Sequence, residues 1–192
     1  MKKIILASAS PQRRALMKIL GLPFSVSPSR AAEKTRVTGG CAHLVQTNAL
    51  RKALEVARRS RQGLVIGSDT VVYSSKKRLI LKPRNLREAK KNLKELMAHP
   101  HWVYSGIAVV DAKTGQTEVG WEKTRVFMTK LSDKAIDRYH RFVSPLDKAG
   151  GFDIEGMGGL FIPRIEGCYF NVVGLPLSKL AEMLRKFGIN VL

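Results

Sequence analysis

The stretch "IILASASPQRRALMKILG", residues 4–21, indicates how this chain begins to fold. Its apolar start predicts a short strand. Ser10 followed by Pro11 is typical of a helix N-terminus, with the serine as the cap and the proline at the first helical position. Gly21 is expected to end that helix. The apolar positions that follow helical spacing are Leu16, Ile19 and Leu20.

The first turn of this helix carries cations where most helices do not. A helix N-terminus bears partial positive charge and favours Asp or Glu, yet Arg13 and Arg14 occupy it. A bound anion would explain this, because serine hydroxyls, unpaired backbone N–H groups and a guanidinium together make a phosphate site. The alternative is that both arginines are solvated. This stretch alone leaves the two interpretations equal.

Length and composition limit the class of protein. The chain has 192 residues and 44% hydrophobic residues, enough for one large domain or two small ones. No run approaches the roughly 18 apolar residues of a membrane span, and the apolar start is too short for a signal peptide. We therefore expect a cytoplasmic protein with no membrane partner. Cys41 and Cys168 lack metal-ligand spacing, which predicts reduced thiols and no zinc site.

The charge is strongly positive, with 34 Lys and Arg against 15 Asp and Glu, a net charge of +19. Such a balance points to a polyanionic partner, either nucleic acid or a phosphate-rich small molecule. Aromatic residues make up only 7% and are not interleaved with the basic runs at 58–61, 76–78 and 87–94, so no stacking platform for single strands is indicated. We interpret most of these cations as solvated and leave open a weak, nonspecific nucleic-acid affinity.

Strand and helix patterns alternate along the chain and predict an α/β fold. We expect strands near 3–7, 64–73 and 78–82, an extended stretch at 23–27 and an antiparallel pair joined by "KTGQ". Helices are expected near 11–20, 42–60, 86–97, 133–142 and 176–187. A Gly-rich loop spans 147–159. The pattern predicts a mixed, twisted sheet flanked by helices, in a single domain over 1–192 with an elaborated second lobe.

A carboxylate interrupts the strong strand "LVIGSDTVVY" at Asp69. An unpaired charge in a buried strand is costly, so Asp69 needs a cation, a metal or a catalytic task. A simple strand-end turn is the alternative, but the strand pattern resumes at Val71 and Val72.

Lys52 lies on the apolar side of the predicted helix at 42–60. The stripe is formed by Ala49, Ala53 and Val56, and Lys52 falls among them. Its side chain either extends along the stripe to solvent or reaches an internal anion, and the pattern does not decide between them.

Two further segments carry candidate residues. Lys82 ends a short apolar strand before Pro83, and the Gly-rich loop bears Asp153 and Glu155, although its spacing matches no P-loop. The combined candidates are the cations Arg13, Lys52 and Lys82 and the carboxylates Glu33 and Asp69. Such a set is suited to metal-assisted attack on a polyphosphate.

Six motifs resemble, in order and spacing, those of the Maf family, once named for septum formation. They are "LASASPQRRALM", "ALRKA", "IGSDTVV", "LKP", "DKAGGFDIEG" and "NVVGLPL", and they span essentially the whole chain. The family consists of nucleoside triphosphate pyrophosphatases with a fold similar to inosine triphosphate pyrophosphatase. The resemblance implies hydrolysis between the α- and β-phosphates, which releases a monophosphate and pyrophosphate, and one use of such an activity is the removal of non-standard nucleotides.

The resemblance also implies roles for residues. Arg13, Lys52, Asp69 and Lys82 match catalytic positions, with Asp69 as general base for water. The nucleoside triphosphate would contact Ser8, Ser10, Gln12, Arg13, Thr70 and Glu155. A divalent cofactor, Mg²⁺ or Mn²⁺, would be held by Glu33 and Asp69, and a homodimer is expected.

Some positions depart from the family pattern. Ala32 stands where the family often has Asp, so the metal would depend on Glu33 and Asp69, and Gln12 replaces an Arg found in one branch. Thr70 is typical of the branch that accepts dTTP and UTP, whereas Glu155 is typical of the branch that accepts 7-methyl-GTP, so base preference stays open. The alternative function is a basic nucleic-acid-binding or cell-division regulatory protein with a vestigial pocket.

Overall fold

The structure is a computed structural model that describes residues 2–192. These residues form two compact units. Unit 1 contains the residues up to Thr70 together with Ser105–Glu122 and Gly174–Leu192, and unit 2 contains Val71–Tyr104 and Lys123–Val173. The expectation of a single domain over the whole chain stays a prediction.

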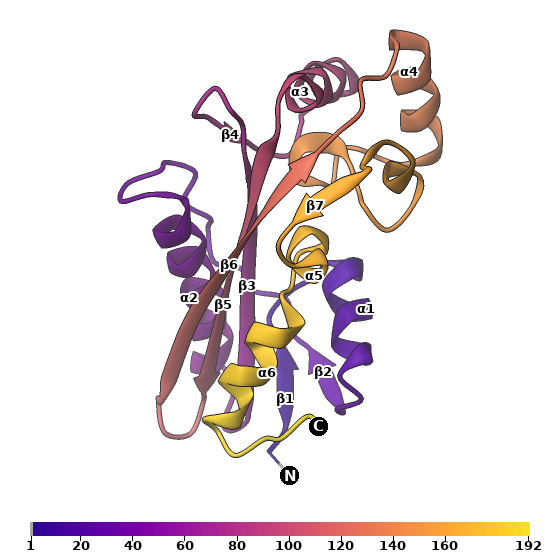
Figure 1. Cartoon of the computed structure of the whole chain (residues 1–192). Helices are drawn as coiled ribbons and strands as arrows, with labels where there is room; N and C mark the ends of the chain where they lie inside the picture. The colour runs from indigo at the N-terminus through magenta and orange to yellow at the C-terminus, as the bar shows by residue number, and fades with distance from the viewer. Residues whose placement is uncertain (1) are drawn as a thin grey trace. The chain divides into compact units, whose positions relative to one another are not determined.

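Residues 2–192 form one seven-stranded mixed sheet (Figure 1). Its strands are β1 (Ile4–Leu6), β2 (Phe24–Val26), β3 (Leu64–Tyr73), β4 (Leu79–Ile80), β5 (His101–Asp111), β6 (Thr117–Phe127) and β7 (Arg164–Glu166). The strand order is β2-β1-β3-β5-β6-β7, with β4 paired to β3. In unit 1, β1 pairs in parallel with β2 and β3, and in unit 2 the pairs β3–β4 and β6–β7 are antiparallel. The predicted mixed α/β class is confirmed.

Helices flank the sheet. They are α1 (Pro11–Ile19), α2 (Cys41–Arg58), α3 (Leu86–Ala98), α4 (Asp133–Phe142), α5 (Tyr169–Val173) and α6 (Leu177–Arg185), with 3-10 segments at Ala149–Gly151 and Met157–Phe161. The predicted strand at 64–73 and helix at 133–142 are confirmed at both ends, whereas the strand expected at 78–82 is reduced to β4. None of the helices in the described residues is long and apolar enough to cross a membrane.

The helix ends follow from local chemistry. Ser10 caps α1 by accepting a hydrogen bond from the Arg13 backbone N–H at 3.4 Å, and Pro11 is its first residue. Ser132 caps α4 in the same way through the Ala135 N–H at 3.2 Å. Gly21 follows α1 with φ +66°, a left-handed conformation that suits glycine and ends the helix.

The core of unit 1 brings α2 unusually close to the sheet. Its buried apolar residues include Ile5, Ala49, Ala53, Val56, Val65 and Ala108. Gly67 of β3 and Gly106 of β5 make this approach possible, because a Cβ at either position would lie 2.2 Å from a backbone oxygen of α2. The two glycines therefore allow the backbone of α2 to lie close to the sheet, which brings polar side chains of α2 within reach of β3.

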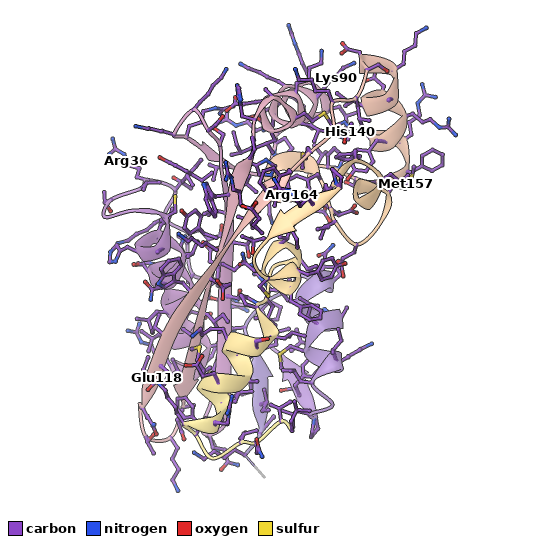
Figure 2. All side chains as sticks on the ribbon, viewed as in Figure 1. Arg36, Lys90, Glu118, His140, Met157 and Arg164 are labelled. Carbon is purple, nitrogen blue, oxygen red and sulfur yellow. The ribbon has the colours of Figure 1, made fainter. Side chains whose placement is uncertain are left out.

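Unit 2 has its own core, formed by residues of its strands, α3, α4 and the Gly-rich loop: Val72, Ile80, Leu93, Leu96, Val103, Val126, Ile136, Tyr139, Phe152 and Phe161. Lys90 of α3, labelled in Figure 2, donates to Asp137 of α4 at 2.8 Å. One apolar position on each of two predicted helices is not buried, since Ile19 is 61% and Leu86 57% exposed. Both are terminal helical residues, which extend past the packed part of the stripe.

Candidate active site

Arg13 is fixed within unit 1 by three acceptors. Its Nε donates to the Gly174 carbonyl at 2.9 Å, Nη2 to Thr70 Oγ1 at 3.0 Å and Nη1 to Ser8 Oγ at 3.3 Å. These contacts use three of the five guanidinium N–H donors, so donors on the two terminal nitrogens are left for an anion. Arg14, by contrast, is exposed. The two neighbouring arginines therefore differ in their surroundings, since only Arg13 is held by these three acceptors.

The serines of the predicted phosphate motif hold the turn before α1. Ser8 is buried and accepts from the Ser10 backbone N–H at 3.2 Å. Ser10 donates its hydroxyl to Gln12 Oε1 at 3.0 Å. The structure thus brings Ser8, Ser10, Gln12 and Arg13 together at one helix N-terminus, and their role in binding phosphate stays a prediction.

Lys52 reaches an internal anion. Its side chain is 10% exposed, and Nζ lies 2.7 Å from Asp69 Oδ1 and 2.6 Å from Glu33 Oε1. Nζ also donates to the Ser68 carbonyl at 3.3 Å. The side chain of Asp69 is 6% exposed and that of Glu33 54%, so the lysine joins a buried carboxylate to one that solvent reaches. Of the two readings of Lys52, contact with an internal anion is the one observed.

Asn48 is part of this cluster, and the sequence analysis did not single it out. Its Nδ2 donates to Asp69 Oδ2 at 2.9 Å, opposite the oxygen that Lys52 contacts. Its amide also exchanges two hydrogen bonds with the backbone of Lys34, at 2.8 and 2.9 Å, and so holds the segment that carries Glu33. Asn48 lies four residues before Lys52 on the same helix face, a spacing that points to it.

The Gly174 carbonyl was also missed. Besides Arg13, it accepts from Ser68 Oγ at 3.1 Å and from Thr70 Oγ1 at 3.3 Å, and Thr70 shares a 2.8 Å hydrogen bond with Ser105. Gly174 has φ +124°, which favours glycine. The three contacts of the Gly174 carbonyl join segments more than 100 residues apart, and only the "NVVGLPL" motif pointed to this region.

Charge links Arg13 to the carboxylate cluster. Burial lowers the pKa of Arg13 below its usual value, while the negative charges of Asp69 and Glu33 act to raise it. Arginine stays protonated under all ordinary conditions, so the site holds two cations, Arg13 and Lys52, against two carboxylates.

Glu33 and Asp69 fit a divalent metal by the chemistry of their donor atoms. Both carboxylates are close to one lysine Nζ, and Mg²⁺ is commonly bound by one or two carboxylates together with substrate phosphates. Among the described residues there is no cluster of three or more His, Cys, Asp or Glu side chains suited to a metal. Phosphate oxygens would therefore have to complete the coordination.

Lys82 and Glu155 belong to unit 2, and both are exposed. The pKa of Glu155 lies above its usual value, because partial burial of the carboxyl and the negative charge of Asp153 raise it. The positive charge of Lys148 acts in the opposite direction but is the smallest of the three effects. The loop around Glu155 is ordered by Asp153, whose backbone N–H donates to Tyr139 Oη at 3.0 Å and whose Oδ1 accepts from the Gly158 N–H at 3.3 Å. The loop is thus held by specific hydrogen bonds.

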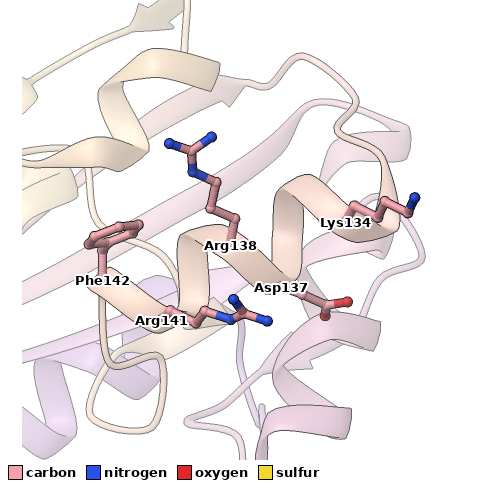
Figure 3. Close-up of a pocket in the computed structure, with 5 residues that line it drawn as sticks. All are labelled: Lys134, Asp137, Arg138, Arg141 and Phe142. Carbon is pink, nitrogen blue, oxygen red and sulfur yellow. The ribbon is translucent and has the colours of Figure 1, made fainter.

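A hollow of about 320 Å³ lies elsewhere in unit 2, on α4 (Figure 3). It is lined by Lys134, Asp137, Arg138, Arg141 and Phe142. None of these residues belongs to the predicted site, and all lie on one helix, so this hollow contributes nothing to the chemistry described above.

Comparison with known proteins identifies the family. A family model described as "Maf-like protein" matches residues 3–187. The dTTP/UTP pyrophosphatase of Desulforamulus reducens is 47% identical over 191 residues, and that of Pelotomaculum thermopropionicum is 46% identical over 194 residues; each comparison covers 100% of both chains.

A solved structure supports the fold. The nucleoside-triphosphatase, a dITP/XTP pyrophosphatase, of Mycobacterium abscessus has a TM-score of 0.50 at 17% identity, over 97% of this chain and 96% of that chain. At this identity the likeness concerns the fold alone, and it agrees with the fold that the motifs implied. By its sequence over nearly its full length, the chain belongs to the Maf family.

Proposed function

We propose that this chain hydrolyses dTTP and UTP between the α- and β-phosphates, giving the monophosphate and pyrophosphate. The relatives at 46–47% identity are named dTTP/UTP pyrophosphatases, and the six family motifs are all present. The observation that carries the proposal is the cluster in which Lys52 bridges Asp69 and Glu33, two carboxylates whose charges also act on Arg13. Such a cluster has the charges needed to bind a polyphosphate and to activate water.

The phosphates are bound at the start of α1. The Ser10 cap, the Ser8 hydroxyl and the remaining donors of Arg13 point to an anion at this helix N-terminus. Lys52 provides the second cation of unit 1, and the resemblance adds Lys82 from unit 2. Arg13 and Lys52 neutralise charge on the leaving pyrophosphate.

Asp69 accepts the proton of the attacking water. The water oxygen forms a bond to the α-phosphorus, the bond from that phosphorus to the bridging oxygen breaks, and pyrophosphate leaves with the electron pair. Asn48 and Lys52 each hold one oxygen of Asp69, which fixes the plane of the carboxylate. Asn48 therefore acts as a positioning residue.

Glu33 and Asp69 are the residues that would hold Mg²⁺ or Mn²⁺. When bound, the metal would offset the negative charge of the phosphates and lower the pKa of a coordinated water. Lys52 then has a second task, because it keeps the two carboxylates close to one another while the site is without its substrate.

The preference for pyrimidines agrees with Thr70, whereas Glu155 is the residue of the other branch. The names of the relatives agree with Thr70, so we assign the pyrimidine preference to this residue and test Glu155 by substitution.

The proposal also includes an assembly and a compartment. We expect a homodimer in the cytoplasm, where its nucleoside triphosphate substrates occur. Light scattering at several protein concentrations tests the dimer directly. A monomer at all concentrations would contradict that part of the proposal alone.

The experiment that tests the function is a panel of dTTP, UTP, CTP, GTP, ITP and 7-methyl-GTP with Mg²⁺ or Mn²⁺, followed by pyrophosphate release. We expect turnover of dTTP and UTP, and its loss when the metal is chelated. Turnover of none of them would favour the alternative of a regulatory or nucleic-acid-binding protein with a vestigial pocket.

A further inference from the structure

One face of the sheet in unit 2 combines aromatic rings with cations. Trp102 lies on β5, Lys123, Arg125 and Phe127 on β6, and Arg164 on β7. We call these five residues the basic-aromatic face. They are spread over more than 60 residues of sequence, which is why the linear pattern showed no aromatic residues interleaved with basic runs. Strand pairing brings them together.

The alternation of β6 separates this face from the core. Thr124 and Val126 are fully buried, whereas Lys123, Arg125 and Phe127 have the opposite parity along the strand. The register of β7 places two more residues on the same side of the sheet, since Arg164 pairs with Phe127 and Glu166 pairs with Arg125.

The cations are stacked on the rings. Arg164 places its guanidinium carbon 3.7 Å from the centre of the Phe127 ring, and Arg125 lies 5.1 Å from the same ring. Over Trp102, Lys123 Nζ lies at 5.1 Å and the Arg125 guanidinium carbon at 5.8 Å. Stacking of this kind orders long side chains while leaving their N–H edges directed away from the ring.

The face is positive and partly exposed: Lys123 and Arg164 are exposed, whereas Trp102 and Phe127 are half-buried. The side chains of Arg164 and Arg125 are 58% and 42% exposed (Arg164 is labelled in Figure 2). Glu166 pairs with both arginines, at 2.6 and 3.7 Å, and its side chain is 47% exposed. The face thus carries the positive charges of Lys123, Arg125 and Arg164, in a chain whose net charge is +19.

We propose that the basic-aromatic face binds single-stranded nucleic acid. The three cations match the phosphate backbone, and the rings and guanidinium planes match the faces of unstacked bases. A duplex keeps its base faces stacked on one another and would not use the rings. An acidic peptide would match the charge but does not present an aromatic ring at each unit, as a nucleic-acid strand does.

The test measures fluorescence anisotropy of end-labelled 15-mers of dT and rU with the full chain, over a series of salt concentrations. We expect binding that weakens as salt rises, and tighter binding of single strands than of a duplex of equal length. Trp102→Leu should weaken binding at least about fivefold, as expected from losing one stacked base. Phe142→Leu, an exposed aromatic on α4, is the matched control and should bind as the unchanged protein does.

Charge is tested by a second matched pair. Arg125→Gln with Arg164→Gln should weaken binding and reduce the salt slope by about 1.4, because two phosphate contacts are lost. Arg87→Gln with Arg141→Gln removes the same charge from exposed sites on α3 and α4 and should change the slope much less. Thermal unfolding of each variant checks that the fold is retained.

Stacking has a spectroscopic signature. The chain has two tryptophans, so in a Trp121→Phe background Trp102 is the sole indole reporter, and its fluorescence should be quenched by dT and rU strands. Quenching should persist with saturating α,β-methylene UTP, which would occupy the nucleotide site.

Several results would overturn the proposal. These are an absence of binding in about 50 mM salt, equal losses in the two arginine pairs, preference for the duplex, or displacement of the strands by the nucleotide analogue. A Trp102→Leu variant that dissociates from dimer to monomer would assign the face to a second copy of the chain instead.

Discussion

Lys52 in unit 1 and Lys82 in unit 2 are both expected to act on the substrate, yet their surroundings differ completely. Lys52 is buried and held by Asp69, Glu33 and the Ser68 carbonyl. Lys82 is exposed, at the end of a short apolar segment before Pro83. The ammonium group of Lys52 is therefore positioned by the fold before any substrate binds, whereas that of Lys82 is exposed to solvent.

The two lysines should contribute differently to the free energy of unfolding. A buried lysine without its carboxylates would be costly, so the unit 1 cluster is tied to the stability of the fold. An exposed lysine adds little to stability and can act only when a ligand reaches it. Substitutions at the two positions should therefore separate folding from catalysis.

The largest effect is expected from Lys52→Met compared with Lys82→Met. We expect both to lower kcat/KM for UTP by roughly 10² or more, since each removes a phosphate-neutralising cation. Only Lys52→Met should also lower the free energy of unfolding, by about 3 kcal/mol, because Asp69 loses its buried partner. Urea unfolding measures this, and equal stabilities would contradict the contrast.

Asp69→Asn is expected to come next. It should reduce kcat by roughly 10² or more while the fold is retained, because the amide keeps the shape but neither accepts the proton nor binds a metal well. Steady-state kinetics with a circular dichroism control checks it. A kcat close to that of the unchanged protein would remove Asp69 from the mechanism.

The next prediction compares the activities of variants at the two neighbouring arginines, Arg13 and Arg14, where a smaller effect is expected. Arg13→Ala should weaken activity about tenfold or more, since it removes a guanidinium aligned by Ser8, Thr70 and Gly174. Arg14→Ala removes the same charge from an exposed position and should change activity less than about twofold. If both variants lost the same activity, general positive charge rather than a placed guanidinium would be responsible.

The smallest effect concerns the base. Glu155→Gln should raise the ratio of kcat/KM for UTP over 7-methyl-GTP several-fold, because an amide donates and accepts where a carboxylate only accepts. The raised pKa of Glu155 adds a pH dependence: as pH falls through it, the carboxyl gains a proton and the ratio should move toward UTP. In Glu155→Gln the ratio should not change over this pH range.

A ratio unchanged both by pH and by the substitution would show that Glu155 does not read the base. Asp153→Asn is a useful companion, since it removes a negative charge that helps to raise the pKa of Glu155, so the pH dependence of the ratio should move to lower pH.

The parts of the site that depend on local pattern were predictable. Ser10 and Pro11 mark the start of α1, and Asp69 interrupts an apolar strand. Lys52 stands in an apolar stripe of α2, and all of these lie in unit 1 as described. Each signal comes from a periodicity or a cap that a short segment carries by itself.

What was missed depends on packing between distant segments. The Gly174 carbonyl meets Arg13 across 161 residues, and no local pattern indicates a backbone acceptor. Asn48 was in principle visible from its spacing to Lys52. The basic-aromatic face needed the register of β6 and β7, which sequence periodicity does not specify.

We propose that water attacks the α-phosphorus of a nucleoside triphosphate with Asp69 as its base. Hydrolysis of UTP in ¹⁸O-labelled water, with mass spectrometry of both products, identifies the phosphorus that is attacked. We expect the label to enter UMP alone, and we expect Asp69→Asn to form this labelled product at least about 10² more slowly. Label in pyrophosphate, or release of inorganic phosphate and UDP, would show that water does not attack the α-phosphorus.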